Sequence, residues 1–345
     1  MPVTLAIDAM SGDHGLSVTV AAALSCVQEN QQLTVILVGD EPAVRKQLAQ
    51  LKAQPDPRLR VHHASEVVGM DETPSKVLRG KKDSSMRVAI DLVKRGEAQA
   101  MVSAGNTGAL MATAKFVLKT LPGIDRPAIV SAIPSINGHV HMLDLGANAE
   151  CTAEQLFQFA VMGTALITAM RGETQPRVAL LNIGSEEIKG SDVIRSAATM
   201  LQASSLNYIG FVEGDGIFLS DVDLVVCDGF VGNVALKTGE GVAKMIRQFL
   251  KEEFTANFLH KLAALAAMPA LKALGKRIDP RHYNGATLLG LNGTVVKSHG
   301  SADQTGFANA IRVGVREVEQ DVPKRISHLL SEALTPPSSR PVVAG

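Results

Sequence analysis

The sequence predicts an α/β fold in which a mostly parallel sheet is flanked by helices. Short runs of β-branched and aliphatic residues alternate with helical patterns along the 345-residue chain, as they do in successive βαβ units. The composition, 46% hydrophobic and 20% charged, is that of a globular protein with a substantial core. Loops rich in glycine and asparagine follow several of the strand runs.

Nine short β-branched or aliphatic runs are predicted to be strands. They are Thr4–Ile7, Thr34–Val38, Leu59–His62, Ala100–Val102, Ala128–Ala132, Val140–Leu143, Val178–Leu181, Tyr208–Val212 and Leu224–Val226. Helical patterns between them include Glu154–Ala169 and Ser191–Ala203. Strands joined by helical crossovers pair in parallel, with helices covering both faces of the sheet.

The chain is expected to form one α/β catalytic unit over residues 1–334. No low-complexity linker, charge run or short-period repeat marks a boundary within it. Residues 335–345 are rich in proline and serine, and we expect a disordered tail there.

The composition also argues against several classes of protein. Thirty-four basic residues balance 34 acidic ones and tryptophan is absent, so no nucleic-acid partner is expected. Cys26, Cys151 and Cys227 form no CxxC pair, so neither disulfides nor a zinc site is expected. No apolar stretch reaches spanning length, and the first residues lack the basic segment of a signal peptide. We therefore expect a cytoplasmic protein.

Residues 254–278 differ in composition from the rest of the chain. They include no acidic residue, and Pro269 is expected to split them into an amphipathic hairpin of two short helices. Apolar residues at helical spacing include Phe258, Leu262, Leu265, Leu271 and Leu274. Periodicity alone favours a hairpin that faces the core or a second copy, and leaves open a basic hairpin at a bilayer surface.

Five loops carry the residues best suited to chemistry. They are Asp8–Gly15 (DAMSGDHG), Ser103–Ala109 (SAGNTGA), Asp144–Glu150 (DLGANAE), Asn182–Glu187 (NIGSEE) and Asp228–Asn233 (DGFVGN). Glycine lets the backbone approach a ligand, and a helix start offers free N–H groups and a favourable dipole. Because ligands bind at the carboxyl ends of strands in open α/β sheets, we expect all five loops at one sheet edge, around an anion.

Several common catalytic motifs are missing. The sequence has no GxGxxG after its first strand, no GxxxxGK[ST], no GxSxG and no HExxH. We therefore expect a reaction without a protein nucleophile in a known motif, without a metal and without a cofactor.

Basic residues beside the loops, taken one at a time, are expected to be surface charges. They are Arg79, Lys81, Lys82, Lys189, Lys237, Lys297 and His299. His62, His63, His139 and His141 lie in or beside predicted strands, and structural roles are expected for them.

Eight segments, which follow one another along the chain in the same order as in the family, resemble the bacterial phosphate acyltransferase family. Besides the loops Asp8–Gly15, Ser103–Ala109 and Asp144–Glu150, they are Lys81–Met86 (KKDSSM), Leu181–Gly190 (LNIGSEEIKG), Gly210–Gly214 (GFVEG), Cys227–Lys237 (CDGFVGNVALK) and Lys297–Gly300 (KSHG). The resemblance extends from Ile7 to about Ala310, which is nearly the whole chain.

The resemblance implies transfer of a long-chain acyl group from acyl carrier protein to inorganic phosphate, forming acyl phosphate for phospholipid biosynthesis. It also implies a homodimer with a fold similar to the isocitrate and isopropylmalate dehydrogenases and the phosphotransacetylases. A membrane acyltransferase that passes the acyl group from acyl phosphate to glycerol 3-phosphate is a further expected partner.

Phosphate is itself the nucleophile in such a reaction, so the site needs only to position a dianion and stabilise an oxyanion. We expect phosphate at the Gly105–Gly108 helix start. The expected catalytic residues are His14, Asn182, Lys189 and Asn233. The expected phosphate- and substrate-binding residues are Asp8, Asp13, Lys82, Gly105, Asn106, Thr107, Gly108, Asn148, Asp228, Lys237 and His299. His14 and His299 are alternatives for the acid that protonates the thiol.

A long-chain product changes the expectation for residues 254–278. Releasing about 14 CH₂ groups into water, at ~0.8 kcal/mol each, costs roughly 11 kcal/mol. Docking of the enzyme on an anionic membrane is therefore favoured, with the five apolar residues named above inserted and neighbouring lysines near the headgroups. The same lysines would also suit acidic acyl carrier protein.

Three alternatives remain open at this point. A short-chain phosphotransacetylase using acyl-CoA would share the anion site, and an isopropylmalate-type dehydrogenase would share the fold. A membrane-bound scaffold without enzymatic activity would need the amphipathic region alone.

Overall fold

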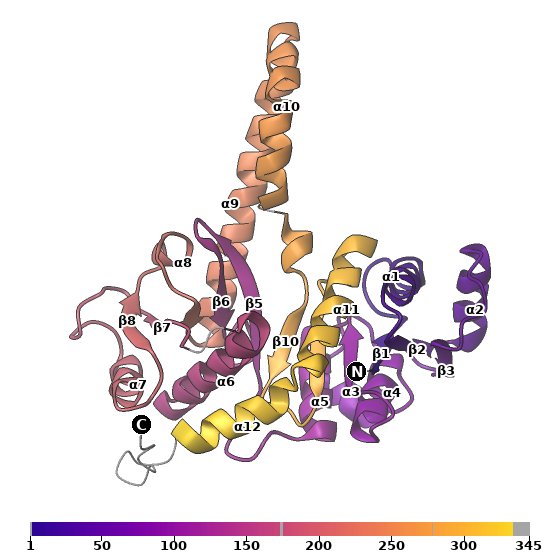
Figure 1. Ribbon diagram of the computed structural model, residues 1–345, viewed down its shortest axis with the longest axis horizontal. Helices are drawn as coiled ribbons and strands as arrows, with labels where there is room; N and C mark the ends of the chain where they lie inside the picture. The colour runs from indigo at the N-terminus through magenta and orange to yellow at the C-terminus, as the bar shows by residue number, and fades with distance from the viewer. Residues whose placement is uncertain (1, 173–174, 278, 334–345) are drawn as a thin grey trace.

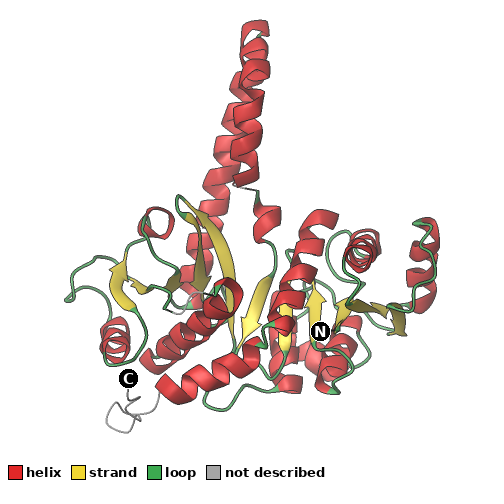
Figure 2. Ribbon diagram, viewed as in Figure 1, coloured by secondary structure: helices red, strands yellow, loops and turns green. Residues whose placement is uncertain are grey.

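The computed structural model describes residues 2–172, 175–277 and 279–333, which form one eleven-stranded sheet with helices on both faces (Figures 1 and 2). The strands are β1 (Val3–Asp8), β2 (Leu33–Gly39), β3 (Leu59–His63), β4 (Ala100–Ser103), β5 (Ala128–Ser135), β6 (Gly138–Leu143), β7 (Val178–Leu181), β8 (Tyr208–Val212), β9 (Leu224–Val226), β10 (Ala286–Leu289) and β11 (Thr294–Lys297). The helices are α1 (Leu16–Glu29), α2 (Glu41–Gln50), α3 (Pro74–Gly80), α4 (Ser85–Lys94), α5 (Thr107–Leu118), α6 (Ala153–Arg171), α7 (Asp192–Gln202), α8 (Gly216–Leu219), α9 (Gly229–Thr255), α10 (Phe258–Arg277), the 3₁₀ helix η1 (Pro280–Tyr283), α11 (Gln304–Glu319) and α12 (Val322–Ala333).

The strand order is β3-β2-β1-β4-β11-β10-β5-β6-β9-β7-β8. Strands β3, β2, β1, β4 and β11 are mutually parallel, and so are β6, β9, β7 and β8. Between these halves, β10 is antiparallel to both its neighbours and β5 is antiparallel to β6. The predicted α/β class with a mostly parallel sheet is therefore confirmed, but its two halves run in opposite directions.

This reversal corrects one expectation. The loops after β1 and β4 leave the sheet in one direction, and the loops after β6, β7 and β9 leave it in the other. The five loops thus do not share one edge of a uniformly parallel sheet. The reason is the β5–β6 hairpin, whose short turn makes these two strands antiparallel within a sheet that was expected to be mostly parallel.

All nine predicted strands are present with the same or slightly wider bounds, and the two helical patterns correspond to α6 and α7. Strands β10 and β11 were not predicted. They are only four residues each and are separated by Gly290 and Gly293, both with positive φ. Such short apolar runs in a glycine-rich segment lack the length that makes a strand pattern recognisable.

Helix α6 shows how local sequence fixes an element in the core. Thr152 and Gln155 form a reciprocal capping box at its start, and Gly172 ends it with a left-handed φ of 73°. Most of its residues are buried, because it packs against β6 and β9 and between α7 and α12. Its first turn thereby anchors the loop that follows β6.

Helices α9 and α10 lie side by side and project as a long hairpin from the α/β body (Figure 1). This corrects the expected hairpin within residues 254–278: α10 continues through Pro269, and its hairpin partner is α9. Alanine-rich flanks of high helix propensity and packing against α9 outweigh the lost N–H of proline. Ile278, the last residue of that range, lies outside the described residues.

Within the described ranges, no helix has both the length and the apolar content needed to cross a membrane. The single catalytic unit expected over residues 1–334 stays a prediction. The tail expected at 335–345 lies outside the described residues.

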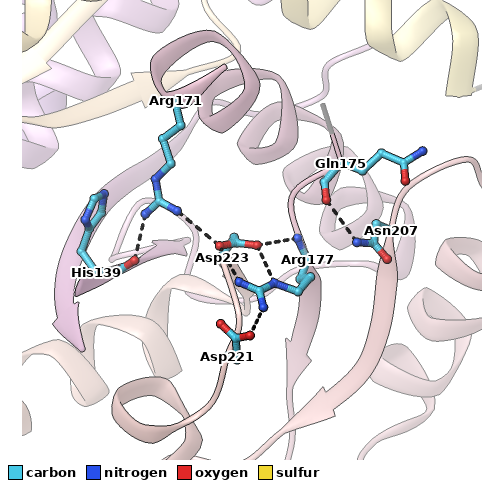
Figure 3. A network of polar contacts seen from close by, with 7 residues as sticks. All are labelled: His139, Arg171, Gln175, Arg177, Asn207, Asp221 and Asp223. Atoms are coloured by element: carbon cyan, nitrogen blue, oxygen red, sulfur yellow. Dashed lines mark hydrogen bonds and ion pairs between the residues drawn. The ribbon is translucent and has the colours of Figure 1, made fainter. Parts of the chain in front are cut away.

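A network around Asp223 joins the amino-terminal ends of β7 and β9 in the second half of the sheet (Figure 3). Asp223 accepts hydrogen bonds from the backbone and guanidinium of Arg177, at 2.8 to 3.2 Å, and from Arg171 at 3.3 Å. Arg171 also donates to the backbone oxygen of His139, at 2.8 Å. Burial lowers the pKa of His141 to about 3, so the neutral ring is the stable form there. This arrangement agrees with the structural role expected for both histidines.

Glu317 of α11 is a buried carboxyl at the junction of the two halves. Its Oε1 accepts a hydrogen bond from Thr287 of β10, whereas its Oε2 has no hydrogen-bond partner among the described residues. Burial raises the pKa of Glu317 from 4.5 to about 7. The raised pKa means that the fold favours the neutral acid. The contribution of Glu317 to the free energy of unfolding is therefore fully present below pH 4.5 and is lost as the pH rises through 7.

Glu317→Gln should therefore remove part of the loss of stability that the wild type shows as the pH rises. The free energy of unfolding of the wild type should fall relative to the variant by about 3 kcal/mol between about pH 4.5 and pH 8. Urea unfolding at both pH values measures this difference. Parallel pH dependence of the two proteins would show that Glu317 ionises in the fold without cost.

Candidate functional site

Three loops meet at the carboxyl ends of β1, β4 and β11. The amide of Asp13 donates to Gly300 O at 2.8 Å, and that of Ser298 donates to Ser103 O at 2.9 Å. Gly12, with φ +84°, fits where a Cβ would lie 3.0 Å from the Cβ of Ala104. The close approach of the backbones makes this a preformed site.

Asp8, the last residue of β1, lies beneath these loops and is only 2% exposed. Its Oδ2 accepts from Ser103 Oγ at 2.7 Å, and Ser103 Oγ accepts from the amide of Gly105 at 3.0 Å. Ser11 Oγ accepts from the amide of Ala104 at 2.9 Å and donates to Asp8 O at 2.8 Å. The two serines thus fix the buried Gly105 turn against β1. Burial raises the pKa of Asp8, and the side chains of Ser85 and Ser103 oppose that rise.

Lys297, the last residue of β11, is 9% exposed and therefore not the surface charge expected from the sequence. Its Nζ donates to Ala104 O at 3.4 Å and to Ser298 O. Burial lowers the pKa of Lys297 to about 8, against the attraction of Asp13 and Asp8. Lys297 was expected at the surface because β11, a strand of only four residues, was not recognised in the sequence. The apolar run Thr294–Val296 before it was the available signal.

Helix α5 begins directly beyond Gly105. Asn106 caps it by accepting from the amide of Ala109 at 3.0 Å, and its Nδ2 donates to Met70 O at 2.8 Å and Glu72 O at 3.0 Å. Both amide hydrogens are thus committed to the loop before α3, so Asn106 is a positioning residue in this structure. The next residues, Thr107 and Gly108, occupy the first turn, whose N–H groups have no carbonyl one turn earlier in the helix.

A second group of residues forms around Asp144 after β6. Asp144 Oδ1 accepts from the amides of Ile129 and Ala147 at 2.9 and 3.1 Å, and Oδ2 accepts from the amide and Nδ2 of Asn148 at 2.7 and 3.0 Å. Asn148 Nδ2 also donates to Pro127 O at 2.9 Å. The expected substrate donor Asn148 is therefore buried and holds the loop in place. Burial raises the pKa of Asp144, which the four N–H donors oppose.

Helix α9 starts against this second group. Asp228 caps α9 by accepting from the amide of Val231 at 2.8 Å, and the amide of Gly229 donates to Asn148 O at 2.7 Å. A Cβ on Gly232 would lie 1.9 Å from Asp144 O, so the helix contacts the loop more closely than any side chain allows. Asp228 therefore sets the direction of α9.

The long α9 connects the two groups. Asn233, near the start of this helix, lies beside Gly146. A Cβ built on Gly146 would be 3.5 Å from the Cβ of Asn233. One turn later, the charge of Lys237 is close enough to lower the pKa of both Lys297 and His299 after the larger effect of burial. A charge on the helix that starts at the second group thus acts on residues of the first group, although the strands of the two halves point in opposite directions.

The loop after β7 is less closely connected. Leu180 pairs with Val226, so Asn182 leaves the sheet beside Asp228. Asn182 is 7% exposed and its Nδ2 donates to Lys189 O at 3.2 Å. Lys189 is exposed, and within the described ranges no hydrogen bond or ion pair joins it to Lys297 or to α5.

The other expected residues lie at the surface of the first group. Asp13, His14, Lys82 and Thr107 are exposed. His299 Nδ1 lies 2.9 Å from Ser301 Oγ, and the amide of His299 donates to Asn284 Oδ1 at 2.9 Å. The described residues contain no group of three or more His, Cys, Asp or Glu side chains suited to a metal ion.

Solved structures place this architecture among known folds. The EutD phosphotransacetylase from Staphylococcus aureus matches with a TM-score of 0.61 and 17% identity, over 92% of this chain and 94% of that chain. A putative 4-hydroxythreonine-4-phosphate dehydrogenase from Salmonella typhimurium matches with a TM-score of 0.53 and 12% identity, over 92% and 99% of the two chains. The chain is thus an α/β protein of the fold class that phosphotransacetylases share with dehydrogenases, and the expected fold is confirmed.

Sequence comparison then gives the family. The model of the fatty acid synthesis protein family matches residues 3–325. The phosphate acyltransferase of Methylococcus capsulatus is 60% identical over 329 residues, or 95% of this chain and 97% of that protein. That of Legionella pneumophila is 57% identical over 321 residues, or 93% and 94% of the two chains. The chain belongs to this family of phosphate acyltransferases and is an enzyme that transfers an acyl group to phosphate.

The contact between Gly232 and Asp144 O can be tested by substitution. Gly232→Ala should destabilise the fold by about 1–3 kcal/mol, because the added methyl forces α9 away from the Asp144 loop. Gly241→Ala in the same helix, where a Cβ meets nothing within 4 Å, should leave stability equal or slightly higher. Thermal unfolding compares them, and equal melting temperatures for the two variants would contradict this account of the α9 start.

Proposed function

We propose that the enzyme moves a long-chain acyl group from acyl carrier protein to inorganic phosphate and so forms acyl phosphate for phospholipid biosynthesis. The observation that carries the proposal is the first group of loops, where buried Lys297 and Asp8 lie under the start of α5. Membership of the phosphate acyltransferases supports phosphate as the acceptor. The description of the family as a fatty acid synthesis protein supports a carrier-bound donor.

Phosphate is placed in this proposal at the first turn of α5. The amides of Thr107 and Gly108 and the helix dipole favour an anion there, and the ammonium of Lys297 lies under the same loop. Lys237 and Lys82 would add positive charge from the rim. Fixed backbone donors hold a dianion ready for attack with little reorganisation at the moment of reaction.

No covalent acyl-enzyme is required in this mechanism. Phosphate attacks the thioester carbonyl, and Asn233, Asn182 and Lys189 are the candidates for stabilising the oxyanion from the second half of the sheet. The cysteines are poorly suited to a nucleophilic role, since burial raises the pKa of Cys26 to about 11 and of Cys151 to about 12, and also raises that of Cys227.

We further propose that the α9–α10 hairpin contacts an anionic membrane, which makes the enzyme a peripheral protein of the cytoplasmic face. Phe258 is 73% exposed, Leu265 68%, and Leu262 and Leu274 48% each. Leu271 is partly exposed beside them. Exposed apolar residues next to basic ones suit the interface between acyl chains and anionic headgroups. An acyl phosphate could then pass to a membrane acyltransferase without crossing water.

A homodimer forms part of the same proposal. Helix α9 presents an apolar stripe of its own, with Val242, Met245, Ile246 and Phe249 each 45% to 56% exposed. Two copies could bury these stripes against each other and leave α10 for the membrane.

The function is tested by incubating the protein with palmitoyl-acyl carrier protein, with and without phosphate. We expect free carrier thiol and palmitoyl phosphate only when phosphate is present. Preference for acetyl-CoA over the carrier-bound palmitoyl group would instead indicate a phosphotransacetylase, and thiol release independent of phosphate would indicate a thioesterase.

Membrane contact is tested with Leu262→Glu/Leu265→Glu. Two charges in the inserted surface should abolish co-sedimentation with anionic liposomes, whereas turnover of palmitoyl-acyl carrier protein without liposomes should change less than about twofold. Ala263→Glu/Ala266→Glu, on the same helix, is the matched control for added charge. Unchanged sedimentation of the leucine variant would show that the hairpin does not insert.

A further inference from the structure

Lys297 is a buried cation beside the loop that leads to the expected phosphate position. Its Nζ contacts the carbonyl of Ala104, which belongs to the loop that opens α5, and the carbonyl of Ser298. An ammonium has three N–H donors, and the two carbonyls accept two of them, so one N–H is left for a ligand.

Charged groups from three other elements face Lys297. Asp8 comes from β1, Asp13 from the loop after β1, and Lys237 from α9. His299, two residues along the chain, interacts with Lys297 as well. Asp8 is 2% exposed, and the hydroxyl groups of Ser85 and Ser103 lie against its carboxyl group. The attraction of Asp13 and Asp8 favours the charged form of Lys297 in a position where burial opposes it.

Acyl transfer to phosphate creates a need for such a group. As the C–S bond breaks, a thiolate forms within a few ångströms of the phosphate dianion, and two anions so close repel each other in a site sheltered from water. Protonation of the sulfur removes this repulsion and prevents the thiolate from attacking the new acyl phosphate.

We propose that Lys297 is the proton donor to the leaving thiolate, which deepens and rests on the function proposed above. An oxygen of HPO₄²⁻ forms the bond to the carbonyl carbon, the C–S bond breaks, and a proton moves from Lys297 Nζ to sulfur. The neutral amine then takes the proton from the P–OH of the acyl phosphate. The products are the acyl phosphate dianion and the free thiol, and the lysine is again protonated.

The acidity of Lys297 suits this role better than that of His299. Burial lowers its pKa to about 8, close to the value of about 8.5 for an alkyl thiol of the cysteine type. Proton transfer between groups of matched pKa is nearly balanced, and the ammonium is still the main form at neutral pH. Partial burial of the His299 ring lowers its pKa, so little of it is protonated there.

Lys297→Met tests the proposal with two donors. With palmitoyl-acyl carrier protein, whose alkyl thiol needs a proton, kcat should fall about 100-fold or more. With the palmitoyl ester of thiophenol, whose thiolate leaves unaided, kcat should fall less than about tenfold. The wild type should lose kcat for the carrier-bound donor as the pH rises through about 8, since the ammonium is the active form, and Lys297→Met should lack this limb.

The controls separate a proton donor from a phosphate-binding charge. Lys297→Arg keeps the charge but does not release a proton at these pH values, so it should lose kcat for the carrier-bound donor while KM for phosphate changes little. Lys324→Met, on the exposed surface of α12, should match the wild type. Equal losses of Lys297→Met with both donors, or full activity of Lys297→Arg, would overturn the role of Lys297. A wild type that forms no acyl phosphate would instead overturn the proposed function.

Discussion

A buried polar cluster of Asp8, Ser103 and Lys297 beneath the start of α5 constrains the rest of this structure. Polar and charged groups are costly to bury without partners, and here Asp8 accepts a hydrogen bond from Ser103 while Lys297 donates to backbone carbonyls. This requires β1, β4 and β11 to be neighbours, and it requires glycine at position 12, where their loops touch. The position proposed for the phosphate thus follows from the order of strands in the sheet.

The reversal of strand direction gives α9 its importance. The Asp144 loop leaves the sheet opposite to the Lys297 loop, so the two groups would be unrelated without a connecting element. Helix α9 begins against Asp144, carries Lys237, whose charge lowers the pKa of Lys297, and continues into the exposed hairpin. One helix therefore borders the site and leads to the surface where an acyl chain could enter a membrane (Figure 1).

The sequence was sufficient for the fold class, nine of the strands and the family, because long apolar periodicity and loop motifs are local signals. Three features of the structure were not predicted from the sequence, because they depend on long-range packing. The buried position of Lys297 required recognition of β11, a four-residue strand whose neighbours lie far away in sequence. Continuation of α10 through Pro269 depended on packing with α9. The internal roles of Asn106 and Asn148 could not be predicted, because an asparagine in a loop looks the same whether its amide faces a ligand or the protein.

The central claim is that the acceptor phosphate lies at the first turn of α5, next to Lys297. A crystal soaked with tungstate, a tetrahedral oxyanion with strong anomalous scattering, tests it most directly. The account predicts an anomalous peak within hydrogen-bonding distance of the Thr107 and Gly108 amides and of Lys297 Nζ. A peak confined to the Asn182–Gly190 loop or to the Asp144 group would contradict it.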